Sequence, residues 1–390
     1  MDQDTSSEIP NVNLENAKIP NVNLENVEIP NVNLENVEIP NVNLKNVAIN
    51  IDDDQKPIPK LNFYSTSSYG LKSSDKMTAV EKLGIFFYTL ALGVSNRDVS
   101  ERFQRSGETI SRAFHEVLEA ITGRSKGFHG LAREMIKPRD PTFQSTPHQI
   151  INDKRYMSIV LVVLMVHILG HASQRPNKYL YIGRKGIPTF NVMAVCDFDL
   201  CFTFISVGWE GSTHDTRVFL HAINNRSMNF PKPSEGKYYL VDKGYPDRKG
   251  YLVPYPKTRY HKSQFENEPP KNMKEAFNRS HSSLRSFIEK SFGILKKRWK
   301  ILGGMPKYSV ETQHDIIIDV FALHNYIRNN DKEDKVFTTF EQHSDYMGCD
   351  ELRDVRGTVT NNDNISSGTS NEMKQIRNDI ATSIWNVRRR

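Results

Sequence analysis

The stretch Asn191–Gly208, NVMAVCDFDLCFTFISVG, decides the fold that we expect. Two runs rich in β-branched, aromatic and other apolar residues, 191–196 and 201–208, flank the sequence Asp-Phe-Asp at 197–199. A short polar break between two such runs is typical of a turn between strands. The stretch therefore predicts an antiparallel β-hairpin.

Strand-like and helix-like segments mix around this hairpin, over residues 154–330. The apolar run at 159–170 is about 12 residues long. Since a helix needs about 20 residues to cross a membrane, the run predicts a buried strand, and we expect no membrane contact. A short strand is expected at 238–241, with long amphipathic helices at 276–300 and 315–329. Together these segments predict a mixed α/β domain.

Residues 76–122 predict a smaller, all-helical domain. The sequences TAVE at 78–81 and SNRD at 95–98 have the spacing of helix N-caps, and a glycine-containing turn precedes a third helix. Helix, turn and helix in this order is the helix-turn-helix pattern of DNA-binding proteins. Its exposed side would present Arg112 and His115 to DNA, although a three-helix unit also serves as a plain packing module.

The two ends of the chain differ from this centre. Residues 1–60 include four tandem decapeptides such as IPNVNLENVE, and a proline every ten residues forbids a continuous helix. We expect disordered repeats there, with a short β-solenoid as the alternative, and assign them no chemistry. Residues 123–153 are expected to be a linker. Residues 331–390 are expected to be a mostly disordered tail with a terminal helix near 371–390.

Charge is distributed unevenly along the chain. Residues 1–60 carry four Lys or Arg against eleven Asp or Glu, whereas residues 271–310 carry ten against two. A concentrated basic stretch suits a polyanion such as DNA, because neutralised phosphates release condensed counterions; a solvated helix face is the alternative. Three cysteines without CxxC spacing argue against a disulfide framework or a structural zinc site. The acidic, polar start of the chain is unlike a signal peptide, so we expect an intracellular protein.

Two acids occupy positions that suit a metal-dependent nuclease. Asp242 follows the apolar sequence YYLV and precedes KGYP, which places it at the end of a predicted strand; a turn aspartate is the alternative. Glu289 falls on the helix at 276–300 beside Arg285 and Lys296, where surface ion pairs are the alternative. Phosphodiester cleavage uses two hard divalent cations, and carboxylates from different elements are suitable ligands.

Five blocks of the sequence resemble the catalytic domain of PIF/Harbinger-type DDE transposases and of host nucleases derived from them. They are NVMAVCDFD at 191–199, GWEGSTHDTR at 208–217, VDKGYP at 241–246, IEKSFGILKKRWKIL at 288–302 and ALHNYIR at 322–328. Arg285, Glu289 and Lys296 also resemble the third-acid signature of related bacterial insertion-sequence transposases. The resemblance implies an RNase H-like DDE nuclease domain at 154–330, preceded by the helix-turn-helix domain.

The resemblance also implies roles for individual residues and a cofactor. Asp242 would be the second acid of the DDE triad, Glu289 the third, and Asp215 an accessory or alternative metal ligand. The cofactor would be a pair of Mg²⁺ or Mn²⁺ ions. The residues expected to contact DNA are Arg112, His115, Arg285, Lys296, Lys297 and Arg298. The implied partners are double-stranded DNA and a Myb/SANT-like protein. The implied location is the nucleus and the cytoplasm, and the chain could form an oligomer.

The first acid of the triad is absent from its expected strand. The family carries an aspartate in a block similar to Cys-Ile-Gly-Ala-Ile-Asp-Gly-Thr-His-Ile, whereas residues 160–171 read VLVVLMVHILGH. Codons compatible with these residues, read two bases further on, can encode Ile-Gly-Gly-Ile-Asp-Gly-Thr-His-Ile-Arg-Ala. We therefore hypothesise a local frameshift, by mutation or in the gene structure. The test is to sequence codons 150–180 in genomic DNA and in the transcript. If these codons cannot encode the aspartate block in another reading frame, the frameshift hypothesis is refuted.

Two functions follow from these observations. The first is a transposase-derived, metal-dependent DNA nuclease whose catalysis is impaired by the missing aspartate. The second is a non-catalytic DNA- or chromatin-binding adaptor descended from such an enzyme. Salt-sensitive DNA binding without cleavage would favour the second.

Overall fold

The computed structural model describes residues 41–43, 48–50, 69–124, 130–145, 147, 160–170, 189–342 and 367–388. Its centre is a sheet in the order β5-β4-β3-β6-β7. The strands are β3 (Val160–Gly170), β4 (Thr189–Cys196), β5 (Phe202–Glu210), β6 (Tyr238–Leu240) and β7 (Tyr251–Leu252). The predicted combination of strands and helices is confirmed.

The predicted hairpin is formed by β4 and β5, which pair antiparallel. Asp197 closes the turn, because its Oδ1 accepts hydrogen bonds from the backbone N–H groups of Asp199 and Cys201, both at 2.9 Å. Burial is the largest influence on this carboxyl and raises its pKa to about 6. The sequence Asp-Phe-Asp therefore acts as the turn that the pattern predicted.

Strand β3 is the central strand, in agreement with the apolar run that predicted it. It pairs antiparallel with β4 and parallel with β6, and β6 pairs parallel with β7. The register sets Met165 opposite Ala194 on β4 and Val163 beside Leu240 on β6. This register determines which positions of β3 lie on the same face of the sheet as the paired residues of β4 and β6.

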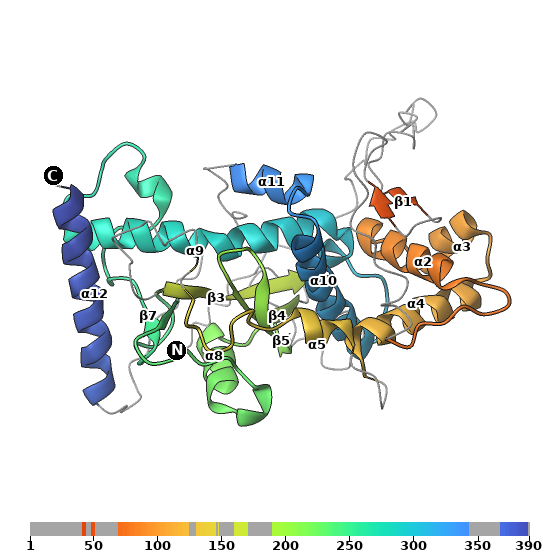
Figure 1. The fold of residues 1–390 in the computed structure, drawn as a ribbon, viewed down its shortest axis with the longest axis horizontal. Helices are drawn as coiled ribbons and strands as arrows, with labels where there is room; N and C mark the ends of the chain where they lie inside the picture. The colour runs from red at the N-terminus through yellow and green to blue at the C-terminus, as the bar shows by residue number, and fades with distance from the viewer. Residues whose placement is uncertain are drawn as a thin grey trace, which may run out of the picture. The chain divides into compact units, whose positions relative to one another are not determined.

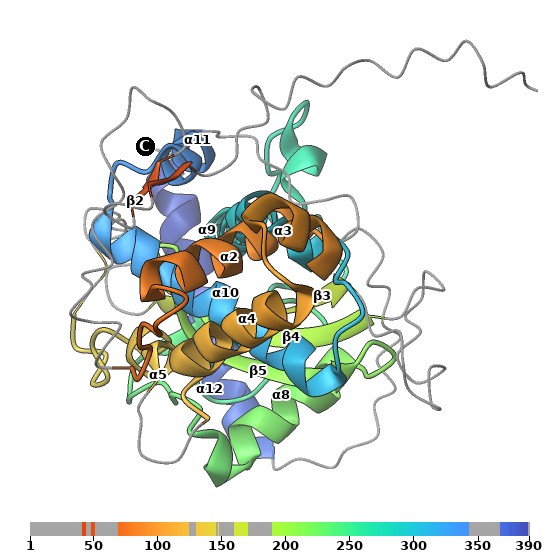
Figure 2. The ribbon, with the colours of Figure 1, turned by 90° about the vertical axis from the view of Figure 1, so that its right-hand side faces the viewer.

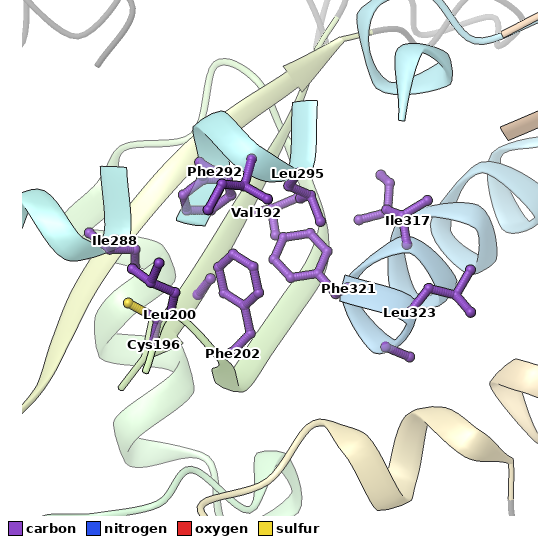
Figure 3. Packing of buried hydrophobic residues seen from close by; sticks show 14 of the residues in the cluster. Val192, Cys196, Leu200, Phe202, Ile288, Phe292, Leu295, Ile317, Phe321 and Leu323 are labelled. Carbon is purple, nitrogen blue, oxygen red and sulfur yellow. The ribbon is translucent and has the colours of Figure 1, made fainter. Parts of the chain in front are cut away.

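Helices cover both faces of the sheet (Figure 1). On one face lie α9 (Met273–Arg298) and α10 (Val310–Asn330), and on the other lies α8 (Asp215–Asn224). Alternate residues of β4 point to opposite sides, as a pleated strand requires. Figure 3 shows Val192 and Cys196 among residues of α9 and α10, whereas Met193 packs in the cluster that includes α8.

The N-terminal helices are α2 (Ala79–Leu92), α3 (Asn96–Phe103) and α4 (Gly107–Thr122), which pack together (Figure 2). Both predicted caps are present. Thr78 accepts a hydrogen bond from the N–H of Glu81, and Ser95 forms a capping box with Asp98. Gly93 ends α2 with φ +67°, a left-handed conformation that favours glycine.

Parts of the predicted linker and tail are helical. The linker contains α5 (Leu131–Met135), which packs against α10. The tail contains α11 (Lys335–Gln342) and α12 (Ser367–Arg388), both packed against α9. The expectation of disorder was therefore wrong for 335–342, because contacts with α9 stabilise a helix there. The predicted terminal helix is confirmed.

Most of the repeat region lies outside the described residues. The exceptions are β1 (Asn41–Asn43) and β2 (Ala48–Asn50), which pair antiparallel. Where the structure describes the chain, none of its helices has the length and apolar character needed to cross a bilayer.

Candidate DNA-processing site

The turn after β6 holds Asp242. The N–H of Val241 still donates to the carbonyl of Leu252 at 3.1 Å, and the chain then turns so that the N–H of Tyr245 reaches the carbonyl of Asp242 at 3.1 Å. The Asp242 Oδ1 accepts from the N–H of Lys243 at 2.7 Å. The predicted position at a strand end is therefore correct.

Asp242 is held in its charged form by its neighbours. Burial acts to raise the pKa of this carboxyl, but the nearby Arg285 guanidinium and the N–H of Lys243 outweigh burial and leave the pKa below its ordinary value. Asp242 is therefore a carboxylate at neutral pH.

Glu289 lies on α9 and is paired with Arg285, one helical turn earlier. Arg285 Nη2 donates to Glu289 Oε1, and the two side chains are only 8% and 16% exposed. Burial acts to lower the pKa of Arg285, but Tyr260, Glu289 and Asp242 together raise it above its ordinary value. The alternative of a surface ion pair is thus wrong for this pair, because both partners face the protein interior.

Arg285 is fixed by a chain of hydrogen bonds that ends on β7. His281 Nε2 lies 3.0 Å from the carbonyl of Leu252, which can only accept, so this nitrogen carries the proton. Burial lowers the pKa of His281 to about 4, and a neutral ring leaves Nδ1 as an acceptor for the Tyr260 hydroxyl at 3.1 Å. The Tyr260 oxygen then accepts from Arg285 Nε at 3.0 Å. The chain orients the guanidinium toward Glu289.

The segment between β7 and α9 adds His261 to the same site. Burial lowers the pKa of this imidazole, and the positive charges of Lys243 and Arg285 lower it further, while Asp242 and Glu289 oppose the shift. Part of the His261 side chain is shielded from water while much of the residue stays exposed, and it lies directly before η4 (Lys262–Phe265). The site therefore combines the turn after β6, the segment before η4 and the middle of α9.

Asp215 is the first residue of α8. The next residue, Thr216, donates its hydroxyl to the carbonyl of Gly244 at 3.1 Å, which holds the start of α8 against the Asp242 turn. The ring of Phe219 packs edge-on against Tyr245, with centroids 4.9 Å apart. Asp215 therefore begins a helix that contacts the turn of Asp242.

Of the predicted DNA contacts, Arg285 corrects our expectation because it is buried and paired with Glu289, and the others differ in exposure. Arg112 and His115 are exposed on α4, and Lys297 is exposed on α9. Lys296 is half-buried. Arg298 corrects our expectation: it is buried and pairs with Asp334, and the side chains are 4% and 5% exposed. It faces inward because α11 covers this end of α9, so it supports packing instead of contacting DNA.

The register of β3 locates the missing acid. Val163 pairs with Leu240, the last residue of β6, and continuing this register by two residues sets position 165 level with Asp242. Position 165 also pairs with Ala194, which belongs to the core cluster that includes Ile288 of α9. Directly paired residues share a face of a sheet, so position 165 belongs to the face that α9 covers. The aspartate codon of the shifted reading frame overlaps codons 164 and 165, and this sequence has methionine at 165.

The residues present do not fit a pair of divalent metal ions. Within the part of the chain that the structure describes, no three His, Cys, Asp or Glu side chains gather as metal ligands would. Of the two acids on this face, Glu289 is already paired with Arg285. A metal ion would have to compete with a buried guanidinium for its ligand, and β3 supplies no carboxylate to compensate.

Comparison with known proteins agrees with the resemblance in the sequence. Residues 166–325, which include Asp242 and Glu289, match the family described as DDE superfamily endonuclease. Residues 59–123 match a domain of unknown function, DUF8040. The protein named "Putative nuclease HARBI1" in Mus musculus is 22% identical over 280 residues, covering 70% of this chain and 67% of the relative. Together the endonuclease match and these relatives support a Harbinger transposase-derived family for this chain.

Two further relatives point to the same family. "Putative nuclease HARBI1" of Homo sapiens is 23% identical over 280 residues, covering 70% of this chain and 67% of the relative. "Protein ALP1-like" of Arabidopsis thaliana is 27% identical over 278 residues, covering 67% of this chain and 63% of the relative. No solved structure matched the chain. The DDE endonuclease superfamily generally uses divalent metal ions. In this chain, Glu289 is instead paired with Arg285.

Sequence reasoning missed three residues of the site: Tyr260, His261 and His281. A signal for His281 was present, because it precedes Arg285 by four residues, as Arg285 precedes Glu289. Residues four apart share a helix face. Tyr260 and His261 lie in an irregular segment without periodicity, so no local pattern marks them.

Proposed function

We propose that this protein is a Harbinger transposase-derived DNA-binding protein whose metal-dependent nuclease activity is impaired. One observation carries the proposal: position 165 of β3, beside Asp242 in the sheet register, is a methionine. A two-metal nuclease needs converging carboxylates to hold both ions. With Asp242 and Glu289 alone, and Arg285 bound to Glu289, the site lacks that ligand set.

The proposed DNA contacts lie on the N-terminal helices and on α9. Helices α3 and α4 are joined by a tight turn, with Gln104 at φ +52° and the N-cap Ser106. Arg112 and His115 project from the outer side of α4. We assign 76–122 a helix-turn-helix role on this basis, with Arg112 and His115 contacting phosphates or base edges.

The catalytic domain is proposed to be RNase H-like, with Asp242 and Glu289 as the remaining triad acids and Asp215 as an accessory acid. The mixed sheet with its central β3 and the helix α9 on one face agree with that fold. Mg²⁺ or Mn²⁺ would be the ions of an intact relative. In this chain we expect the domain to bind DNA or chromatin in the nucleus. We expect a Myb/SANT-like protein to be its partner there.

One preparation of the full chain tests the proposal. Duplex binding is measured by fluorescence anisotropy from low to high salt, and cleavage is measured with Mg²⁺ and with Mn²⁺. We expect affinity to fall steeply with salt and no cleavage. Salt-independent or absent binding would contradict the DNA-binding role. Cleavage that disappears in Asp242→Ala would contradict the impairment.

A further inference from the structure

Helix α2 is buried around most of its circumference. Ile85, Phe86 and Phe87 are consecutive, so their side chains point about 100° apart around the helix, yet they are 0%, 0% and 2% exposed. A helix on the outside of a small domain buries one face, whereas a helix that is apolar all round lies in a core. Helix α2 therefore has neighbours on opposite sides.

The neighbours of α2 belong to different parts of the chain. On one side, Ile85 packs in a cluster with Val99 of α3 and Ile110 of α4. On another side, Phe87 belongs to the cluster that includes residues of α9 and α10. Its ring stacks on Trp299, with centroids 6.3 Å apart and ring planes 24° apart. Trp299 is the C-cap of α9 and is 2% exposed, so α2 joins the other N-terminal helices to the end of α9.

The end of α2 lies directly against the backbone that follows α9. A methyl group built on Gly93 would come within 3.1 Å of the backbone nitrogen of Ile301 and within 3.2 Å of its Cα. Ile301 belongs to η5 (Lys300–Gly303). These distances are shorter than ordinary van der Waals contact, so the absence of a side chain at Gly93 lets α2 approach this closely.

Helix α4 is attached to the start of α10 at two points. The ring of Phe114 stacks on Tyr308, with centroids 5.4 Å apart and planes 7° apart, and Tyr308 directly precedes Ser309, the N-cap of α10. Arg124, just beyond the end of α4, pairs with Asp315 of α10 at 2.6 Å. The middle and the end of α4 are therefore both held against α10.

We infer that residues 69–124 are a fixed part of the catalytic domain and not a separately moving DNA-binding domain. The inference rests on the DNA-binding function proposed above, and it assigns a role to the segment that matches a domain of unknown function. Domains joined by small, polar interfaces usually move relative to one another. Here a continuous apolar cluster joins α2 to α9, so a duplex bound by α4 is held in one orientation relative to the helix that carries Glu289.

The test is native-state hydrogen exchange of the full chain, followed at the slowest amides of α2 and of α9. The variant is Val99→Ala, because Val99 is 0% exposed and packs in a cluster formed by the N-terminal helices. Amides that exchange through one cooperative opening respond equally to a loss of stability. We expect the cavity to speed exchange in α2 and in α9 by the same factor, at least about tenfold.

Faster exchange confined to α2, α3 and α4 would overturn the inference, because it would show that these helices open separately from α9. Ile110→Val makes a smaller change in the same cluster and replaces Val99→Ala if that variant does not fold. Arg97→Ala, on the exposed side of α3, is the control and should leave the slowest amides of both helices unchanged.

The close contact at Gly93 has its own matched pair of variants. Gly93→Ala and Gly236→Ala both place alanine at a positive φ, +67° and +74°, but a methyl group at Gly236 would meet no atom within 4 Å. Gly93→Ala should therefore lower the melting temperature by more than Gly236→Ala does. Equal losses would mean that α2 does not need to lie against η5, which would contradict the inference.

Added duplex separates this inference from the proposed function. When the free duplex is at about 100 times its Kd, binding to the folded state alone slows globally exchanging amides about 100-fold. We expect this factor in α9 as well as in α2. Protection restricted to α2, α3 and α4 would overturn the inference, while DNA binding would stand. If the duplex slows no amide, the DNA-binding function fails, and Val99→Ala still decides whether these helices are a fixed part of the domain.

Discussion

Arg285 and Glu289 lie one turn apart on α9 and form an ion pair that is largely removed from water, with side chains 8% and 16% exposed. Asp242 on the neighbouring turn adds a second negative charge to the same guanidinium. Arg285 thus supplies a counter-charge that the two acids share. This arrangement determines how the protein should respond to mutation.

Replacing Arg285 with methionine should destabilise the protein by about 3–5 kcal/mol, because it leaves Asp242 and Glu289 without their counter-charge. Glu289→Gln should also lower stability. In a site built for metal ions, removing one of several crowded acids would instead relieve repulsion and raise the stability of the metal-free protein. Urea denaturation in EDTA distinguishes the two, and a Glu289→Gln protein more stable than the parent would contradict the self-balanced site.

The buried pair of Arg298 and Asp334 should attach α11 to α9. Arg298→Met should cost about 3 kcal/mol, because it strands Asp334 in a buried environment. Arg298→Met/Asp334→Asn should recover much of that stability, because the amide oxygen can still accept from the N–H groups of Val336 and Phe337 without a buried charge. Lys297 precedes Arg298 on the same helix and is exposed. Lys297→Ala should therefore change stability by less than about 0.5 kcal/mol. Denaturation midpoints measure all three, and an equal effect of Arg298→Met and Lys297→Ala would refute this role.

His281 should contribute stability that is lost as the pH drops from about 6.5 toward 4. Burial lowers the pKa of His281 to about 4, so the unfolded chain takes up a proton in this range and the folded protein does not. Each such group contributes at most about 1.4 kcal/mol per pH unit. His281→Gln keeps a donor for Leu252 and should flatten the pH dependence by up to that amount, whereas exposed His214→Gln should not. Identical slopes in the two variants would rule out His281 as a source.

On α4, Arg112→Ala should weaken duplex binding and reduce the salt slope by about 1 if it contacts a phosphate. Arg97→Ala is the control, because Arg97 is exposed on α3 and paired with Glu101. Anisotropy titrations at several salt concentrations measure both. Equal slopes for the two variants would mean that α4 does not present Arg112 to DNA.

The sequence predicted those parts of the fold that depend on short-range chemistry. The caps at Thr78 and Ser95 and the turn at Asp197 each use side-chain contacts within four residues. Such contacts leave a local pattern. The positions of Asp242 and Glu289 at a strand end and on α9 were recognisable for the same reason.

Long-range contacts were not predictable in this way. Helix α11 is short and depends on the pairing of Arg298 with Asp334, 36 residues apart. Tyr260 reaches Arg285 across 25 residues from an irregular segment. Arg298 points inward because α11 covers that face of α9. The periodicity of the α9 sequence does not indicate which of its faces another helix will cover.

The central claim is that position 165 lacks the acid that would complete the site beside Asp242. The most direct measurement compares DNA cleavage, with Mg²⁺ or Mn²⁺, by the unchanged chain, Met165→Asp and Leu164→Asp. Leu164→Asp is the matched control, because its register partner Val195 belongs to the cluster on the α8 side of the sheet. We predict cleavage by Met165→Asp alone. Cleavage by the unchanged chain that Asp242→Ala abolishes would contradict the account.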